Sequence, residues 1–175
     1  MKRLTLVVLA VGLLAVSCNK KSDTPTSPSS AQTVFIYNAV ALPANENPAV
    51  ANSENTGKAV AGFTLTVTRD GSGIITGGKG DFGVTVSGFP STTVFTIMHV
   101  HEGNASTNGP IRVNSGLTSG EVSLLSGGAQ VNKLGIDVGA ALAQSIINDP
   151  SQFYFNIHTV ANGGGVARAQ LVRVN

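Results

Sequence analysis

The sequence predicts an all-β fold, an antiparallel Greek-key sandwich or barrel with one short helix. The chain of 175 residues contains many short segments rich in β-branched and aromatic side chains, separated by glycine-containing turns. Only 11% of the residues are charged and 21 are glycine, which favours a β-rich extracytoplasmic domain over a cytosolic helical enzyme. A helical pattern is evident in one segment alone, so the helix is expected to interrupt a β structure.

The expected strands are short, and several alternate between apolar and polar residues. They lie at residues 33–40, 58–68, 82–87, 92–101, 111–114, 120–125, 153–159 and 166–174. Residues 92–101 are apolar on both faces, which predicts a central strand covered on both sides. The glycines of residues 70–73 and 77–80 predict turns. The helix is expected between Asp137, as its cap, and Asn148, with Asp149-Pro150 ending it.

The amino terminus has the pattern of a secretory signal. A basic start, Lys2-Arg3, precedes an apolar stretch too short to span a membrane, and Ser17-Cys18 ends it. This junction resembles a bacterial lipobox, which implies residues 1–17 as a lipoprotein signal peptide and Cys18 as the lipid attachment site. The alternative is an ordinary signal peptide with an incidental cysteine. Residues 18–32 are rich in serine, threonine and proline and predict a flexible tether, followed by one domain at residues 33–175.

Charge and motifs narrow the class of function. Lysine and arginine total 11 against 9 acidic residues, so the chain lacks the basic excess of a nucleic-acid-binding protein. A single cysteine excludes a disulfide within the chain. No Gly-x-Ser-x-Gly motif, phosphate-binding loop or paired acidic residues of glycosidase type are evident. These observations favour a binding or structural module over an enzyme. The expected partners are the membrane, through the lipid anchor, and an envelope protein or polysaccharide.

The three histidines of the chain are the strongest candidates for a site. His99 and His101 alternate with Val100, so both project from one face of their strand, and His158 lies opposite the apolar face of another. If the two strands are neighbours, the imidazoles converge within about 10 Å and could bind one copper or zinc ion, with Glu102 or an aspartate completing a closed zinc site. The interpretation favoured over a metal site is structural, because the glycine-rich loops that follow have backbone groups in need of partners. Arg168 is expected either to contact an anion or to lie at the surface beside Gln170.

Several motifs resemble the CHRD domain, named from chordin and also found in bacterial secreted proteins. They are residues 42–48, 98–103, 109–113, 153–159 and 165–171, in the family's order, and the resemblance covers residues 33–174. Two positions depart from the family pattern: Ala169 stands where glycine is usual, and residues 163–165 replace a proline–glycine turn. The resemblance implies an extracytoplasmic β domain of immunoglobulin-like type with no agreed enzymatic activity.

Residues 99–103 together with Gly109-Pro110 are also similar to the copper-binding segment of Cu,Zn superoxide dismutase. This similarity implies His99 and His101 as copper ligands and Arg168 as an anion-steering arginine. The zinc loop of that family is absent, since residues 104–111 contain neither histidine nor aspartate. The alternative function is therefore a copper- or zinc-binding protein, a degenerate redox enzyme at most. The cofactor expected is none, or a single copper or zinc ion.

Overall fold

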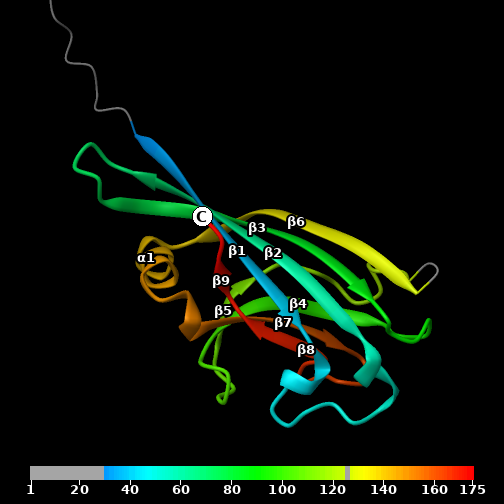
Figure 1. The fold of residues 1–175 in the computed structure, drawn as a ribbon. Coiled ribbons are helices and arrows are strands. Elements are labelled where there is room, and N and C mark those ends of the chain that lie inside the picture. Colours follow the sequence, from blue (N-terminus) through cyan, green and yellow to red (C-terminus); the bar gives the residue numbers. More distant parts are fainter. Residues whose placement is uncertain (1–29, 125–126) are drawn as a thin grey trace, which may run out of the picture.

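The computed structural model describes residues 30–124 and 127–175, which form two antiparallel sheets packed face to face (Figure 1). The larger sheet has the order β6-β3-β2-β1-β9 and the smaller sheet has the order β5-β4-β7-β8. The strands are β1 (Ala31–Ala41), β2 (Lys58–Arg69), β3 (Ile75–Ser87), β4 (Phe95–Glu102), β5 (Ile111–Asn114), β6 (Gly128–Val138), β7 (Phe153–Thr159), β8 (Ala167–Gln170) and β9 (Val172–Arg173). The predicted all-β class is confirmed, and within the described residues both sheets remain open, as in a sandwich.

Four helices accompany the strands in the described parts of the chain. The α-helix is α1 (Ala140–Asn148), and three single-turn 3₁₀ helices are η1 (Pro43–Asn45), η2 (Ser53–Thr56) and η3 (Pro150–Gln152). The prediction of one short α-helix ending before Asp149-Pro150 is correct. Its predicted cap is wrong, because β6 continues through Asp137, whose carboxylate lies 2.6 Å from Lys79 on β3, and Gly139 holds the cap position.

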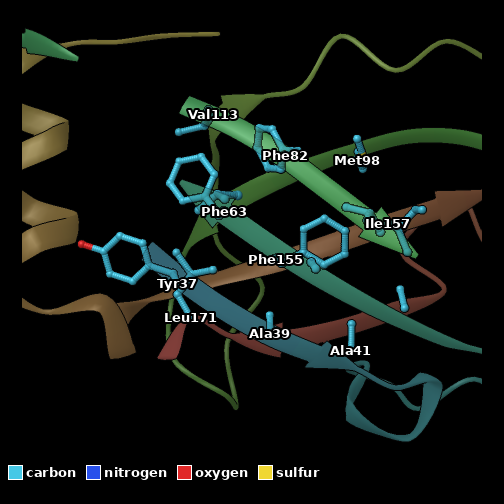
Figure 2. Close-up of a cluster of buried hydrophobic side chains, with 14 of the residues drawn as sticks. Tyr37, Ala39, Ala41, Phe63, Phe82, Met98, Val113, Phe155, Ile157 and Leu171 are labelled. Carbon is cyan, nitrogen blue, oxygen red and sulfur yellow. The ribbon is translucent and has the colours of Figure 1, made fainter. Parts of the chain in front are cut away.

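The core lies between the two sheets and is filled from both. Figure 2 shows the side chains of β1, β2 and β3 facing those of β4 and β7 across the interior. Phe63 is the centre of an aromatic row, with ring centroids 6.2 Å from Tyr37 and 5.0 Å from Phe82. Phe155 and Met98 are fully buried opposite this row. Each such side chain contributes roughly 1.5–3 kcal/mol by leaving water, so this contact holds the smaller sheet in place.

Residues 77–80 lie inside β3, so the predicted turn is wrong at this position. Gly80 pairs with Leu65 of β2, next to Phe63. A Cβ atom at Gly80 would stand 2.7 Å from the Phe63 ring, closer than side chains allow. The glycine therefore makes room for an aromatic ring on the neighbouring strand. Gly80, which in the sequence indicates a turn, thus serves packing within a sheet.

Three other differences concern weak strand signals. The described part of the expected strand at residues 120–125 contains no strand. Strand β6 was not expected, because this edge strand is half exposed and lacks a clean alternation. The expected strand at residues 166–174 is two strands, β8 in the smaller sheet and β9 in the larger, with buried Leu171 between them.

The predicted signal peptide and the lipid attachment at Cys18 lie outside the described residues, as does the predicted tether up to residue 29. Strand β1 starts at Ala31, two residues before the predicted domain start. Among the described residues, no helix combines the length and apolar character needed to cross a membrane.

Candidate functional site

The smaller sheet has a polar face on the side away from the core. Because side chains alternate along a strand, Met98, Val100, Phe155 and Ile157 point into the core, while their neighbours point the other way. We call these neighbours the polar face: His99, His101, Tyr154, Asn156, His158 and Arg168. The register places His99 beside Asn156, and Asn156 beside Arg168, across β4, β7 and β8. All six residues are buried although they face away from the core.

Loops cover the polar face and are hydrogen-bonded to it. Tyr154 accepts a hydrogen bond from the backbone N–H of Gly109, and Gln170 donates to the carbonyl of Gly103. At the end of β7, buried Glu54 of η2 accepts hydrogen bonds from Thr159 and from Asn162 in the loop that follows. Segments far apart in the sequence are therefore fastened over one surface.

The three histidines converge, as the strand parity predicts. Strands β4 and β7 are neighbours, and one ring nitrogen from each histidine lies within 4.8 Å of the others. The ring of His99 is central, with its centroid 4.8 Å from that of His101 and 4.6 Å from that of His158. These are the side chains of the described residues that could hold a metal ion.

Two backbone carbonyls fix the tautomers of the outer histidines. Nδ1 of His101 lies 2.8 Å from the oxygen of Gly109, and Nδ1 of His158 lies 2.9 Å from the oxygen of Gly163. A carbonyl oxygen accepts only, so each Nδ1 carries the proton and each neutral ring keeps a lone pair on Nε2. His101 Nε2 lies 3.0 Å from His99 Nδ1, which donates to it. Nε2 of His158 is buried without a partner.

All three imidazoles are neutral at pH 7. Burial, with a smaller contribution from nearby His158 and His101, lowers the pKa of His99 to about 3. Burial also lowers the pKa of His101 and of His158, although the carbonyls of Gly109 and Gly163 act in the opposite direction. Neutral imidazole is the form that binds metal ions.

Glu102 does not join the histidines. Its position next to His101 gives it the opposite strand parity, and its carboxylate lies 3.3 Å from Arg112 Nε, with the side chain about half exposed. No aspartate or other carboxylate of the described residues belongs to the cluster. A closed zinc site, which would need Glu102 or an aspartate as its fourth ligand, therefore does not form among the described residues.

Arg168 is 2% exposed, so the predicted surface pair with Gln170 is wrong. Loops fold over Arg168, and its guanidinium donates to four oxygens: the carbonyls of Asn45, Ala105 and Thr107 and the side chain of Asn108. It also lies over the Tyr154 ring, 4.8 Å from the centroid. Its contacts thus join two loops to the sheet, and the anion contact stays a prediction.

Glu46 was not singled out from the sequence, although it lies in one of the motifs shared with the CHRD domain. Its Oε1 atom is buried without a partner, as is Oδ1 of Asn156. Each oxygen would lie 2.8 Å from a Cβ atom at Gly165, so both face the same small space. Burial raises the pKa of Glu46 to about 7, against the lowering effect of Arg168. A pocket of about 490 Å³ opens beside these groups, lined in part by Glu46, Arg168 and Gln170.

The family model of the CHRD domain matches residues 37–171, a range that contains the whole polar face and its loops. The chain therefore belongs to the CHRD domain family. The searches of curated proteins and of solved structures found no match to the chain. The family supports a binding or structural module of extracytoplasmic type.

Proposed function

We propose that this protein is a lipid-anchored protein of the cell envelope whose CHRD domain is a binding module. The binding surface is the polar face with its covering loops. The observation that carries this proposal is the set of buried acceptors without partners at that face: His158 Nε2, Asn156 Oδ1 and Glu46 Oε1.

Unpartnered acceptors that gather at one face support a binding role, because a ligand could supply the missing partners. A buried polar atom without a hydrogen bond costs roughly 1–3 kcal/mol, so folded proteins satisfy nearly all of them. The covering loops do satisfy many groups here, including the guanidinium of Arg168 and the Nδ1 atoms of two histidines. The acceptors left over are consistent with a ligand that supplies donors or a positive charge.

The envelope location rests on the sequence around Cys18. A short apolar stretch that ends in Ser17-Cys18, followed by a polar tether, favours a lipidated cysteine over an incidental one in an oxidising compartment. The protein partner or polysaccharide expected in the envelope would reach the domain from outside the membrane.

The anchor is tested with Cys18→Ala in the full-length chain, using membrane fractionation and incorporation of labelled palmitate. We expect the wild type and the control Ser22→Ala in the membrane fraction with label, and Cys18→Ala without label and released. A Cys18→Ala protein that stays membrane-bound contradicts the anchor. The non-enzymatic role is tested separately: copper-loaded protein that consumes superoxide catalytically contradicts it.

A further inference from the structure

We propose that His99, His101 and His158 bind one transition-metal ion, zinc or copper, and leave a fourth coordination position open. This inference deepens the proposed function, since it names the first ligand of the polar face. It depends on that face but not on the lipid anchor.

The spacing of the nitrogens suits one ion. A tetrahedral ion with bonds of about 2.0–2.1 Å to nitrogen places its ligand atoms about 3.4 Å apart. His99 Nδ1 and His101 Nε2 lie 3.0 Å apart, and one nitrogen from each of the three histidines lies within 4.8 Å of the others. An ion bound between the first two atoms would replace the hydrogen bond that joins them, and the proton of His99 would then lie on Nε2. The nitrogens would need to approach one another by at most about 1.4 Å to reach the required distances.

The hydrogen bonds around the three histidines orient their ring nitrogens for a metal ion. The carbonyls of Gly109 and Gly163 hold the protonated Nδ1 of His101 and His158, so each Nε2 lone pair points away from the loop. A ligating histidine typically donates its other N–H to such a partner, which fixes the ring orientation. A purely structural role explains these two carbonyl contacts, but it leaves His158 Nε2 without a partner. A bound ion would give His158 Nε2 the partner that it lacks.

The donor set selects the class of ion. Three neutral imidazoles with no carboxylate among them suit zinc and copper, whereas calcium and magnesium prefer oxygen ligands. Three protein ligands are the number found in zinc sites that keep an exchangeable position. The guanidinium of Arg168 lies over the Tyr154 ring, which is itself stacked on the His101 ring, so it adds positive charge beside the site. An anion is therefore the expected fourth ligand.

The test uses protein produced without a histidine tag and stripped of metal with a chelator. Zn²⁺, Cu²⁺ and Cu⁺ are titrated in separate experiments against a competing chromophoric chelator, with Cu⁺ kept under anaerobic conditions. We expect one ion per chain, and a loss of affinity of about 100-fold or more in His99→Gln and in His158→Gln. Glu102→Gln is the matched control, because this acidic residue next to His101 lies outside the cluster, and it should bind as the wild type does.

Three further measurements keep the result interpretable. Circular dichroism establishes that each variant is folded, and thermal melts with and without the ion should show a metal-dependent rise in Tm for the wild type and Glu102→Gln alone. Electron paramagnetic resonance of the Cu²⁺ form should show coupling to several nitrogens. Absence of binding by wild type overturns the metal site, as does binding that survives in both folded histidine variants. Neither outcome alters the fractionation of Cys18→Ala, so failure of the metal site is distinguishable from failure of the anchor.

Discussion

Glu46→Gln should change how the stability of the domain depends on pH. The buried carboxyl of Glu46 has a pKa raised from 4.5 to about 7, because burial disfavours the charged form more than Arg168 favours it. A folded state that holds a proton more tightly than the unfolded state loses stability as pH rises between the two pKa values. With 1.36 kcal/mol per unit of pKa, the free energy of unfolding should fall by about 2.5 kcal/mol from pH 5 to pH 8 through this group alone.

Glutamine reproduces the neutral form at every pH, and its amide can donate to the unpaired Oδ1 of Asn156. The variant should therefore lack this contribution. Relative to wild type, Glu46→Gln should gain about 2.5 kcal/mol of stability between pH 5 and pH 8. His99, His101 and His158 act in the opposite sense, because their lowered pKa values destabilise the folded state as pH falls below 6.5. Both proteins carry these histidines, so the difference between the two free energies of unfolding contains no contribution from them.

The assay is urea unfolding followed by far-UV circular dichroism at pH 5, 6, 7 and 8, with a chelator present throughout. Glu102→Gln reports the effect of removing a negative charge that is about half exposed. A difference between Glu46→Gln and wild type that stays constant with pH would show that the folded state does not retain the proton. A difference that moves in the opposite direction would show a carboxylate stabilised by Arg168.

Two further substitutions test the packing and the loops. Gly80→Ala should destabilise the domain by about 1–3 kcal/mol in urea unfolding, because the added Cβ atom meets the Phe63 ring. The control Gly77→Ala has open space around its Cβ atom and should be neutral or slightly stabilising. Equal stabilities of the two variants would show that the Phe63 ring moves aside freely. Arg168→Lys should cost roughly 2–4 kcal/mol, because an ammonium group cannot reach the four oxygens that the guanidinium contacts. Limited proteolysis should then cleave residues 103–110 faster than in wild type, and unchanged rates would mean that other contacts hold this loop.

Strand periodicity predicted the local part of the site, and the long-range pairing had to come from the structure. Alternation alone placed His99 with His101 on one face and His158 opposite Phe155. The closeness of these histidines required β4 and β7 to be neighbours, which their separate patterns leave open. The burial of Arg168 and the role of Glu46 depend on loops folding back over the sheet, and no local period encodes that contact.

The sequence predicted strands correctly where one face of the strand is buried and carries a clear apolar pattern. It failed where the position in the sheet, and not the residue type, decides the structure. Strands β1, β2 and β7 have strong β-branched and aromatic content, and their predicted positions are correct within a few residues. In β3, Gly80 makes room for the Phe63 ring and, together with the other glycines of residues 77–80, resembles a turn in sequence. In β6, an edge position requires few apolar residues, so the strand lacks the pattern that would reveal it.

The direction of β1 sets which end of the domain lies nearer the amino terminus. Its first residue, Ala31, pairs with Arg69 near the tip of the β2–β3 hairpin, and its last residue, Ala41, lies just before η1 and Glu46 (Figure 1). At about 3.3 Å per residue, the strand separates these two ends by roughly 33 Å. A chain tethered through its amino terminus would hold the hairpin end toward the membrane and carry the η1 loop outward. The strand would then act as a spacer that presents the pocket beside Glu46 to the surroundings, where a large partner could approach it without meeting the lipid surface.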